Sequence, residues 1–319
     1  MGKVETIQLK MPSFSQSPRK VWIYLPNSYD ETKKHYDVLY MFDGHNLFFD
    51  ETATYGKCWG MKKYLDENNS ELVVVGVDCN HTGNRRLAEY CPFKPETTHL
   101  ESLPSVRPAG KKTAEWFVNV LKPEIEKRYR VFTDRKHIGI GGSSMGGLMS
   151  EYMIAQYNNV YSKAACVSPS THFCYEDLKK LIENTTFHKD TKIYIDQGSQ
   201  EVHGKRLFID AVEMMLNINH LYSEQGCLTY PHLTPGGHHT ESDWEKVVPV
   251  FLNYLFPNIN KLNYLVCFIF LHLMIGLRAS HLLHSDIQMH GFQTYLMHLH
   301  FLLYHQRIHI PLSLSHMYQ

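Results

Sequence analysis

A serine inside a glycine-rich turn is the strongest chemical signal in the sequence. Gly142-Ser143-Ser144-Met145-Gly146 fits the pattern G-x-S-x-G, and it stands between an apolar run, His137 to Ile140, and a stretch with helical spacing, Leu148 to Tyr157. Between a strand and a helix this pattern forms a nucleophile elbow, a turn so tight that its flanking positions must be small. The serine then lies at a helix N-terminus, where backbone N–H groups favour negative charge. We predict Ser144 as a nucleophile; Ser143 is the alternative, but it lacks the flanking glycine spacing.

A serine nucleophile needs a base to take its proton and an acid to orient that base. His239 follows two glycines after the last strand-like segment, and its neighbour His238 is expected to point elsewhere. Glu201 and Asp196 both stand near the end of the preceding strand-like segment, and the residues alone leave the choice between them open. The order Ser144, Glu201, His239 is the Ser…acid…His order of α/β-hydrolases, so the three positions support one another.

Acyl transfer also needs N–H donors for the oxyanion, and a lost donor typically costs about 10²–10³ in kcat. One donor is the backbone N–H of the residue after the nucleophile, here Met145. The second comes from a loop after an early strand, and His45, which follows Asp43-Gly44, is placed for it. The side chain of His45 is not needed for this role. We expect no metal and no cofactor in this chemistry.

The segments around these residues alternate between apolar runs and helical patterns. Residues 4–11 and 20–25 look like two antiparallel edge strands. Apolar runs, typical of parallel strands buried on both faces, occur at 36–42, 72–78 and 137–140, and further strands are expected at 163–168, 192–196 and 228–233. Helices are expected at 59–68, 115–129 with a kink at Pro123, 148–157, 205–219 and 242–256. This alternation predicts an α/β fold, a mostly parallel sheet with helices on both faces.

Functional sites in such sheets form at the carboxyl ends of the strands. Residues 43–46, Ser144, Glu201 and His239 each follow a predicted strand, so we expect them on one edge of the sheet. Residues 79–112 lack clear periodicity and contain four prolines. A loop of this length is usually functional, so we interpret it as a lid or pocket wall, with an insertion without function as the alternative.

Composition narrows the class of protein. The 319 residues suffice for one large α/β domain or two small ones, and 32 Lys and Arg balance 32 Asp and Glu, so nothing favours nucleic acid as a partner. Seven scattered cysteines without C-x-x-C spacing indicate reduced thiols. With no apolar secretory signal at the N-terminus, we expect a cytoplasmic location. The oligomeric state is not predicted.

The C-terminal segment differs in kind. Residues 257–319 hold nine of the 21 histidines and a single acidic residue, Asp286. The apolar run from Tyr264 to Leu277 is shorter than the ~20 residues that span a bilayer. We predict that residues 1–256 form the folded domain and that 257–319 lie outside it. We expect no membrane partner; a membrane anchor and a His-rich metal segment are the alternatives for the tail.

Several motifs together resemble the "Putative esterase" (esterase D-like) family of α/β-hydrolases, which includes enterochelin, feruloyl and acetyl-xylan esterases and mycolyltransferases. The resemblance covers about residues 5–256 and rests on six segments: LYMFDGHNLFFDE (39–51), VVGVDCNHTGNRRLAEYCPF (74–93), IGIGGSSMGGLMS (138–150), ACVSPS (165–170), YIDQGSQE (194–201) and GGHHTESDW (236–244).

The resemblance implies an α/β-hydrolase fold and a serine carboxylic-ester hydrolase acting on a small-molecule ester. It implies Ser144, His239 and Glu201 as the triad and His45 and Met145 as oxyanion donors. The stretch from Arg86 to Pro92 is implied as a pocket wall. Three alternatives remain: an acyltransferase on the same site, an inactive binding module anchored by the tail, and a specialist for siderophore or feruloyl esters. The sequence does not identify the ester.

Overall fold

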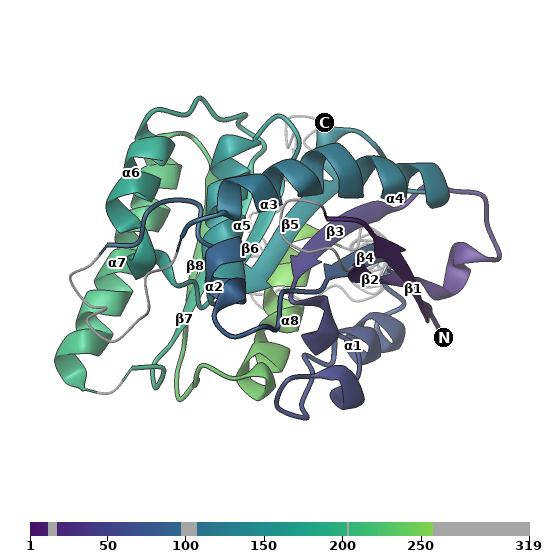
Figure 1. The fold of residues 1–319 in the computed structure, drawn as a ribbon, viewed down its shortest axis with the longest axis horizontal. Coiled ribbons are helices and arrows are strands. Elements are labelled where there is room, and N and C mark those ends of the chain that lie inside the picture. The colour runs from purple at the N-terminus through teal and green to yellow at the C-terminus, as the bar shows by residue number, and fades with distance from the viewer. Residues whose placement is uncertain (12–17, 97–106, 203, 258–319) are drawn as a thin grey trace, which may run out of the picture. The chain divides into compact units, whose positions relative to one another are not determined.

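The structure, a computed structural model, describes residues 1–11, 18–96, 107–202 and 204–257 (Figure 1). The chain divides into two units, Met1–Asn258 and Ile259–Gln319. The second unit lies outside the described residues, and so do the predictions made for the tail. Within the described ranges no helix is both long and apolar enough to cross a membrane. The six cysteines in these ranges are buried free thiols.

The core element is an eight-stranded sheet in the order β1-β2-β4-β3-β5-β6-β7-β8. Its strands are β1 (Lys3–Leu9), β2 (Arg19–Leu25), β3 (Asp37–Phe42), β4 (Leu72–Val77), β5 (Ile138–Ser143), β6 (Lys163–Val167), β7 (Lys192–Gly198) and β8 (Leu228–Thr234). Strand β2 pairs antiparallel with β1 and β4, and every other neighbouring pair is parallel. The prediction of a mostly parallel sheet is confirmed. The prediction of β2 as an edge strand is wrong, because β4 pairs with its second side.

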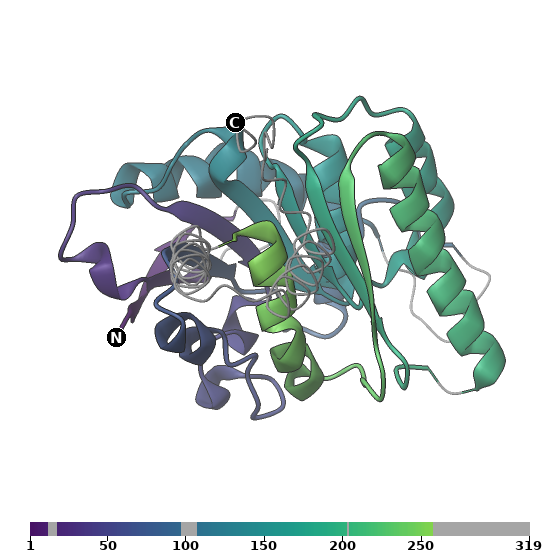
Figure 2. The same cartoon turned by 180° about the vertical axis from the view of Figure 1, so that it is seen from behind.

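Helices cover both faces of the sheet (Figures 1 and 2). They are α1 (Met61–Glu67), α2 (Arg85–Glu89), α3 (Gly110–Trp116), α4 (Lys122–Arg128), α5 (Met145–Gln156), α6 (Tyr175–Glu183), α7 (Lys205–Glu224) and α8 (Glu241–Leu255). Successive side chains of a strand point to opposite faces. Tyr40 of β3 therefore packs in the core beneath α5, whereas Met41 packs in the second core with Trp244 and Phe251 of α8.

Two elements have boundaries that differ from the sequence-based prediction, one at the glycines after Ile140 and one at Pro123. Strand β5 extends to Ser143 and α5 begins at Met145, because the glycines of this segment lie in the strand rather than in a long turn. The predicted kinked helix 115–129 is α3 and α4 joined by a π-helical turn, Phe117–Leu121. Pro123 has no N–H to donate, and the wide turn places it near the start of α4, where no donor is required.

Candidate active site

Backbone strain marks one edge of the sheet. Among the described non-glycine residues, Ser144, Asp43, Ser168 and Asn69 have positive φ. The first three directly follow β5, β3 and β6, whose carboxyl ends meet at the same edge. Such conformations cost of order 1–3 kcal/mol each and gather at functional sites. Asn69 lies elsewhere, in the turn after α1. The strain thus coincides with the edge that the sequence predicts as the site.

Ser144 occupies the sharp turn between β5 and α5, with φ 58° and ψ −124°. A Cβ on Gly142 would lie 2.9 Å from the carbonyl carbon of Gly146, and a Cβ on Gly146 would lie 2.9 Å from Cβ of Phe42. Neither position therefore accepts a larger side chain. The N–H of Ser144 donates to the carbonyl of Val167 at 3.0 Å, which ties the turn to the end of β6. This geometry is that of a nucleophile elbow.

His239 and Glu201 lie together beyond β8 and β7. Nδ1 of His239 is 2.9 Å from Oε2 of Glu201. A carboxylate only accepts hydrogen bonds, so Nδ1 carries the hydrogen and Nε2 presents its lone pair. The Glu201 side chain is only 5% exposed. The indole of Trp244 packs edge-on against the imidazole, with ring centroids 5.0 Å apart. The pair is thus held by contacts on both residues.

The Glu201 carboxylate accepts three further hydrogen bonds. Gln197 Nε2 donates to Oε2 at 2.9 Å, and Ser168 Oγ donates to Oε1 at 2.7 Å. The backbone N–H of Gly198 also donates to Oε1. Ser168 in turn accepts a bond from the indole N–H of Trp244 at 3.0 Å. Both carboxylate oxygens are therefore fixed in place, and so is the imidazole that Glu201 holds.

Asp196 and His238, the alternatives to Glu201 and His239, have other partners. Asp196 is buried, and it accepts bonds from the backbone N–H of Ser168 and the hydroxyl of Tyr194. Burial, together with the nearby charge of Glu201, raises the pKa of Asp196 to about 7. His238 is exposed, and its Nδ1 lies 3.4 Å from Asp243 Oδ2. In this geometry Glu201, rather than Asp196, contacts the candidate base.

The Ser144 hydroxyl has a different partner from the one expected. Its Oγ lies 3.2 Å from the hydroxyl of Ser170. Within the described residues no hydrogen bond joins Ser144 to His239, although Ser170 and His239 line the same pocket. Catalytic hydrogen bonds are often absent or long without substrate and form in the complex. Ser170 was not predicted as a site residue, because serine in a Ser-Pro-Ser turn is common in loops.

The two predicted oxyanion donors lie at the starts of helical turns. Met145 is the first residue of α5, so its N–H has no acceptor within the helix. His45 lies in a short 3₁₀ turn, Gly44–Asn46, directly after β3. A Cβ on Gly44 would lie 2.3 Å from the carbonyl carbon of Gly76, so this loop rests directly on β4. The side chain of His45 points away from this role, with Nε2 2.9 Å from Thr54 Oγ1.

An ion pair fixes the same loop. The Arg86 guanidinium donates from Nε and Nη2 to the two oxygens of Asp43, at 2.8 and 2.7 Å. Burial raises the pKa of Asp43, but the charge and hydrogen bonds of Arg86 outweigh this effect and hold the pKa below its ordinary value. Arg86 therefore holds the loop that carries His45, the predicted oxyanion donor, whereas the resemblance implies a pocket wall for it.

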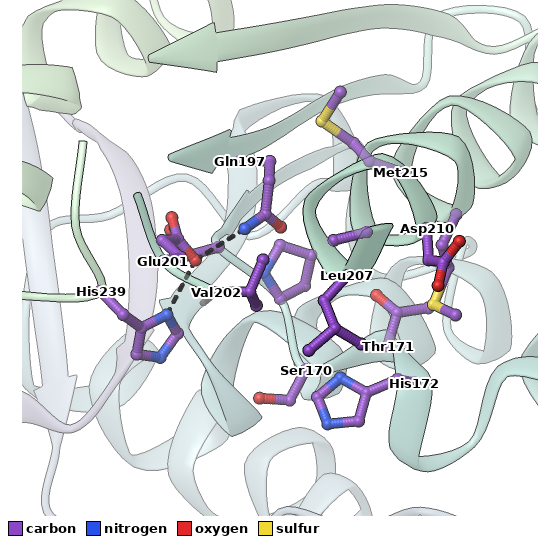
Figure 3. Close-up of a pocket in the computed structure, with 14 residues that line it drawn as sticks. Ser170, Thr171, His172, Gln197, Glu201, Val202, Leu207, Asp210, Met215 and His239 are labelled. Carbon is purple, nitrogen blue, oxygen red and sulfur yellow. Dashed lines mark hydrogen bonds and ion pairs between the residues drawn. The ribbon is translucent and has the colours of Figure 1, made fainter. Parts of the chain in front are cut away.

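A cavity of about 620 Å³ opens beside His239 (Figure 3). It is lined by Ser168, Pro169, Ser170, Thr171, His172, Gln197, Glu201, Val202, Leu207, Asp210, Ala211, Met214, Met215 and His239. The N-terminal half of α7 supplies most of its apolar wall. The loop 79–112, predicted as a lid or pocket wall, contributes no residue to the lining of this cavity within its described part. The sequence predicts a helix at 205–219 but not its place in the pocket wall, because the pattern is that of an ordinary amphipathic helix.

The chain resembles known proteins over the whole described domain. It is 25% identical over 189 residues to the uncharacterized protein YbbA of Bacillus subtilis (strain 168), covering 59% of this chain and 71% of that one. Its structure is similar to an IroE-like serine hydrolase from Shewanella oneidensis, with TM-score 0.62, 16% identity and 79% of each chain covered. It is also similar to the siderophore hydrolase EstA from Aspergillus nidulans, with TM-score 0.58, 18% identity, and 78% of this chain and 94% of that chain covered.

These structural similarities show an α/β-hydrolase fold, as the sequence predicts. Residues 13–253 match the family described as "Putative esterase". The matched range includes the turn at Ser144 and the loops that carry His45, Glu201 and His239. The chain therefore belongs to this esterase family.

Proposed function

We propose that the protein is a serine carboxylic-ester hydrolase with Ser144 as nucleophile, His239 as base and Glu201 as the acid that orients it. Membership of the esterase family supports an ester hydrolase that acts on a small-molecule ester. The observation that carries the finer proposal is the strained Ser144 at the same sheet edge as the His239–Glu201 pair. Residues held in such strained conformations gather at active sites.

In the proposed reaction each of these residues has one role. Ser144 Oγ bonds to the acyl carbon while its proton passes to Nε2 of His239, and the carbonyl oxygen becomes an oxyanion held by the N–H groups of Met145 and His45. His239 then returns the proton to the leaving alcohol as the ester C–O bond breaks. A water molecule repeats the sequence on the acyl-enzyme, giving the acid and free Ser144. The Glu201 carboxylate stabilises the imidazolium at both stages.

The cavity supports a bulky ester as substrate. Its wall from α7 is apolar, with Leu207, Met214 and Met215, whereas Asp210 and His172 add polar groups (Figure 3). A cavity of about 620 Å³ is within the range of roughly 300–1,000 Å³ that accommodates drug-sized ligands. We propose that an aromatic acyl group with polar substituents occupies it, in preference to acetyl. A panel of acetyl, feruloyl and catecholate esters measures this preference; equal kcat/KM for all three would contradict it.

The triad is tested with Ser144→Ala in the full chain. Hydrolysis of a p-nitrophenyl butyrate ester should fall by about 10⁴ or more, because removing a triad nucleophile leaves only binding and oxyanion effects. Labelling by a fluorophosphonate should also disappear. Ser143→Ala is the matched control, since Ser143 lies in β5 beside the elbow, and it should keep its label. If Ser144→Ala keeps more than about a hundredth of the rate, Ser144 is not the nucleophile.

A further inference from the structure

Four side chains with metal-binding chemistry gather beside the oxyanion loop. One ligand atom from each of His45, Asp78, Cys79 and His81 lies within 4.8 Å of all the others. His45 follows β3, and the other three follow β4, so the parallel pairing of these two strands brings them together. The proposed hydrolysis uses only the backbone N–H of His45. These four side chains therefore have no assigned role.

The four ligand atoms lie close together, but their separations are not yet those of a metal-bound set. Asp78 Oδ1 lies 2.9 Å from His45 Nδ1 and 2.8 Å from His81 Nε2. Cys79 Sγ lies 3.9 and 4.0 Å from the two ring nitrogens of His81. Bond lengths of about 2.0–2.3 Å to a tetrahedral ion place ligand atoms roughly 3.3–3.8 Å apart. The present separations lie on either side of this range, so the side chains must rotate when an ion binds.

His45 supplies the second observation. Its ring is 6% exposed, and within the described residues its Nδ1 makes no hydrogen bond. The nearby Asp78 oxygen is within 2.9 Å but lies off the direction in which an N–H would point. On the other side of the ring, Nε2 contacts Thr54 Oγ1, which fixes the ring with Nδ1 aimed into the cluster. A hydrogen bond of this kind is the usual support of a metal-binding histidine.

We propose that His45 Nδ1, Asp78, Cys79 Sγ and His81 Nε2 bind a divalent transition-metal ion of the zinc class. Mixed nitrogen, sulfur and oxygen ligands select such borderline ions over Mg²⁺ and Ca²⁺, which prefer oxygen alone. On binding, the Cys79 thiol releases its proton to solvent and its sulfur donates to the metal. The His81 side chain is 56% exposed, which leaves a path for the ion to enter. The bound ion would link the end of β4 to the oxyanion loop.

Cobalt titration of the full chain tests the site, because a thiolate bound to Co²⁺ gives a near-ultraviolet charge-transfer band that histidine ligands do not. This distinction matters because residues 257–319 contain nine histidines and one cysteine, Cys267. Wild type should show the band at one ion per chain. Cys79→Ser should abolish it, and the matched variant Cys267→Ser should keep it. A band that is absent in wild type, or that survives in Cys79→Ser, overturns the proposal.

Zinc affinity, measured by competition with a chromophoric chelator, provides a second readout. His81→Ala should weaken binding by at least tenfold, and Thr54→Val should weaken it about 10–100-fold by releasing the His45 ring. His220→Ala is the control, because His220 is an exposed residue of α7 that pairs with Glu224. Ser144→Ala should bind zinc like wild type, so this test is independent of the proposed hydrolysis. If His81→Ala binds as tightly as His220→Ala, the ion binds elsewhere.

Discussion

Replacing Glu201 with glutamine is a sharp test of the proposed mechanism, because four donors surround this carboxylate. Oε1 faces Ser168 and the backbone N–H of Gly198, and Oε2 faces Gln197 and His239. Glutamine offers one oxygen and one NH₂ group in their place. The NH₂ group cannot face the backbone N–H of Gly198, since that donor cannot turn. It must therefore take the position of Oε2.

At that position the new NH₂ group meets the N–H of His239. The imidazole escapes the conflict by moving its hydrogen from Nδ1 to Nε2, since Nδ1 then accepts from the amide. Nε2 is then unable to take the proton of Ser144. A wrong tautomer of this kind lowers kcat by about 10⁴ in the Ser-His-Asp enzymes, which corresponds to about 5 kcal/mol of transition-state stabilisation. We expect Glu201→Gln to lose about 10³–10⁴ in kcat, with KM nearly unchanged because the two side chains have the same size.

The assay is steady-state hydrolysis of a p-nitrophenyl ester near pH 7, with thermal unfolding to show that each variant is folded. Asp196→Asn is the matched control, because Asp196 is a buried acid of β7 with no contact to His239. Its kcat should stay within about tenfold of wild type. The reasoning is refuted if Glu201→Gln keeps more than about a tenth of wild-type kcat, or if Asp196→Asn loses as much activity as Glu201→Gln.

Three further variants probe the surroundings of the site. Arg86→Gln leaves the buried charge of Asp43 unpaired, so the free energy of unfolding measured in urea should fall by about 3–5 kcal/mol. A decrease below about 1 kcal/mol would contradict a stabilising role of the ion pair. Burial raises the pKa of Glu151 to about 8 from an ordinary 4.5, so the folded state holds this proton after the unfolded chain has released it. Wild-type stability should therefore fall as pH rises from about 4.5 to about 8. Glu151→Gln should reduce the fall in Tm over this window. An equal fall in Tm for wild type and variant would count against this role of Glu151. Ser170→Ala should change kcat less than about tenfold, because Ser170 only holds the resting Ser144 hydroxyl; a hundredfold loss would place Ser170 in the proton transfer.

The sheet and the edge that carries the site are predictable from the sequence, because local patterns encode both. Apolar runs identify β3, β4, β6, β7 and β8, and a polar residue directly after a parallel strand is placed at the carboxyl edge by the fold itself. The contact between Glu201 and His239 was not predictable with the same certainty. From the sequence, Asp196 is an equally good candidate for the triad acid. Only the turn of the chain after β7 brings Glu201 to the imidazole of His239.

The pocket is the part that the sequence does not reveal. Its apolar wall comes from α7, and facing side chains such as Leu207 and Met215 are placed by how the helix crosses β7 and β8, not by their spacing alone. The proposed metal-binding cluster is not predictable from the sequence for a related reason. Asp78, Cys79 and His81 show no regular ligand spacing, and His45 joins them only through the pairing of β3 with β4.

The order of the strands places the proposed oxyanion donor on one side of Ser144 and the pocket on the other. Strand β5 lies between β3, whose loop carries the proposed oxyanion donor His45, and β6, which leads to β7, β8 and the pocket. A change on the β3 side alters a group that acts on the developing charge, so it should lower kcat and leave KM nearly unchanged. Arg86→Lys, which keeps the charge but loses the paired hydrogen bonds to Asp43, should behave this way. A change on the other side, such as Leu207→Ala, removes ground-state binding of a bulky ester and should raise KM with little effect on kcat. If both variants change the same parameter, the two sides of the elbow do not act separately.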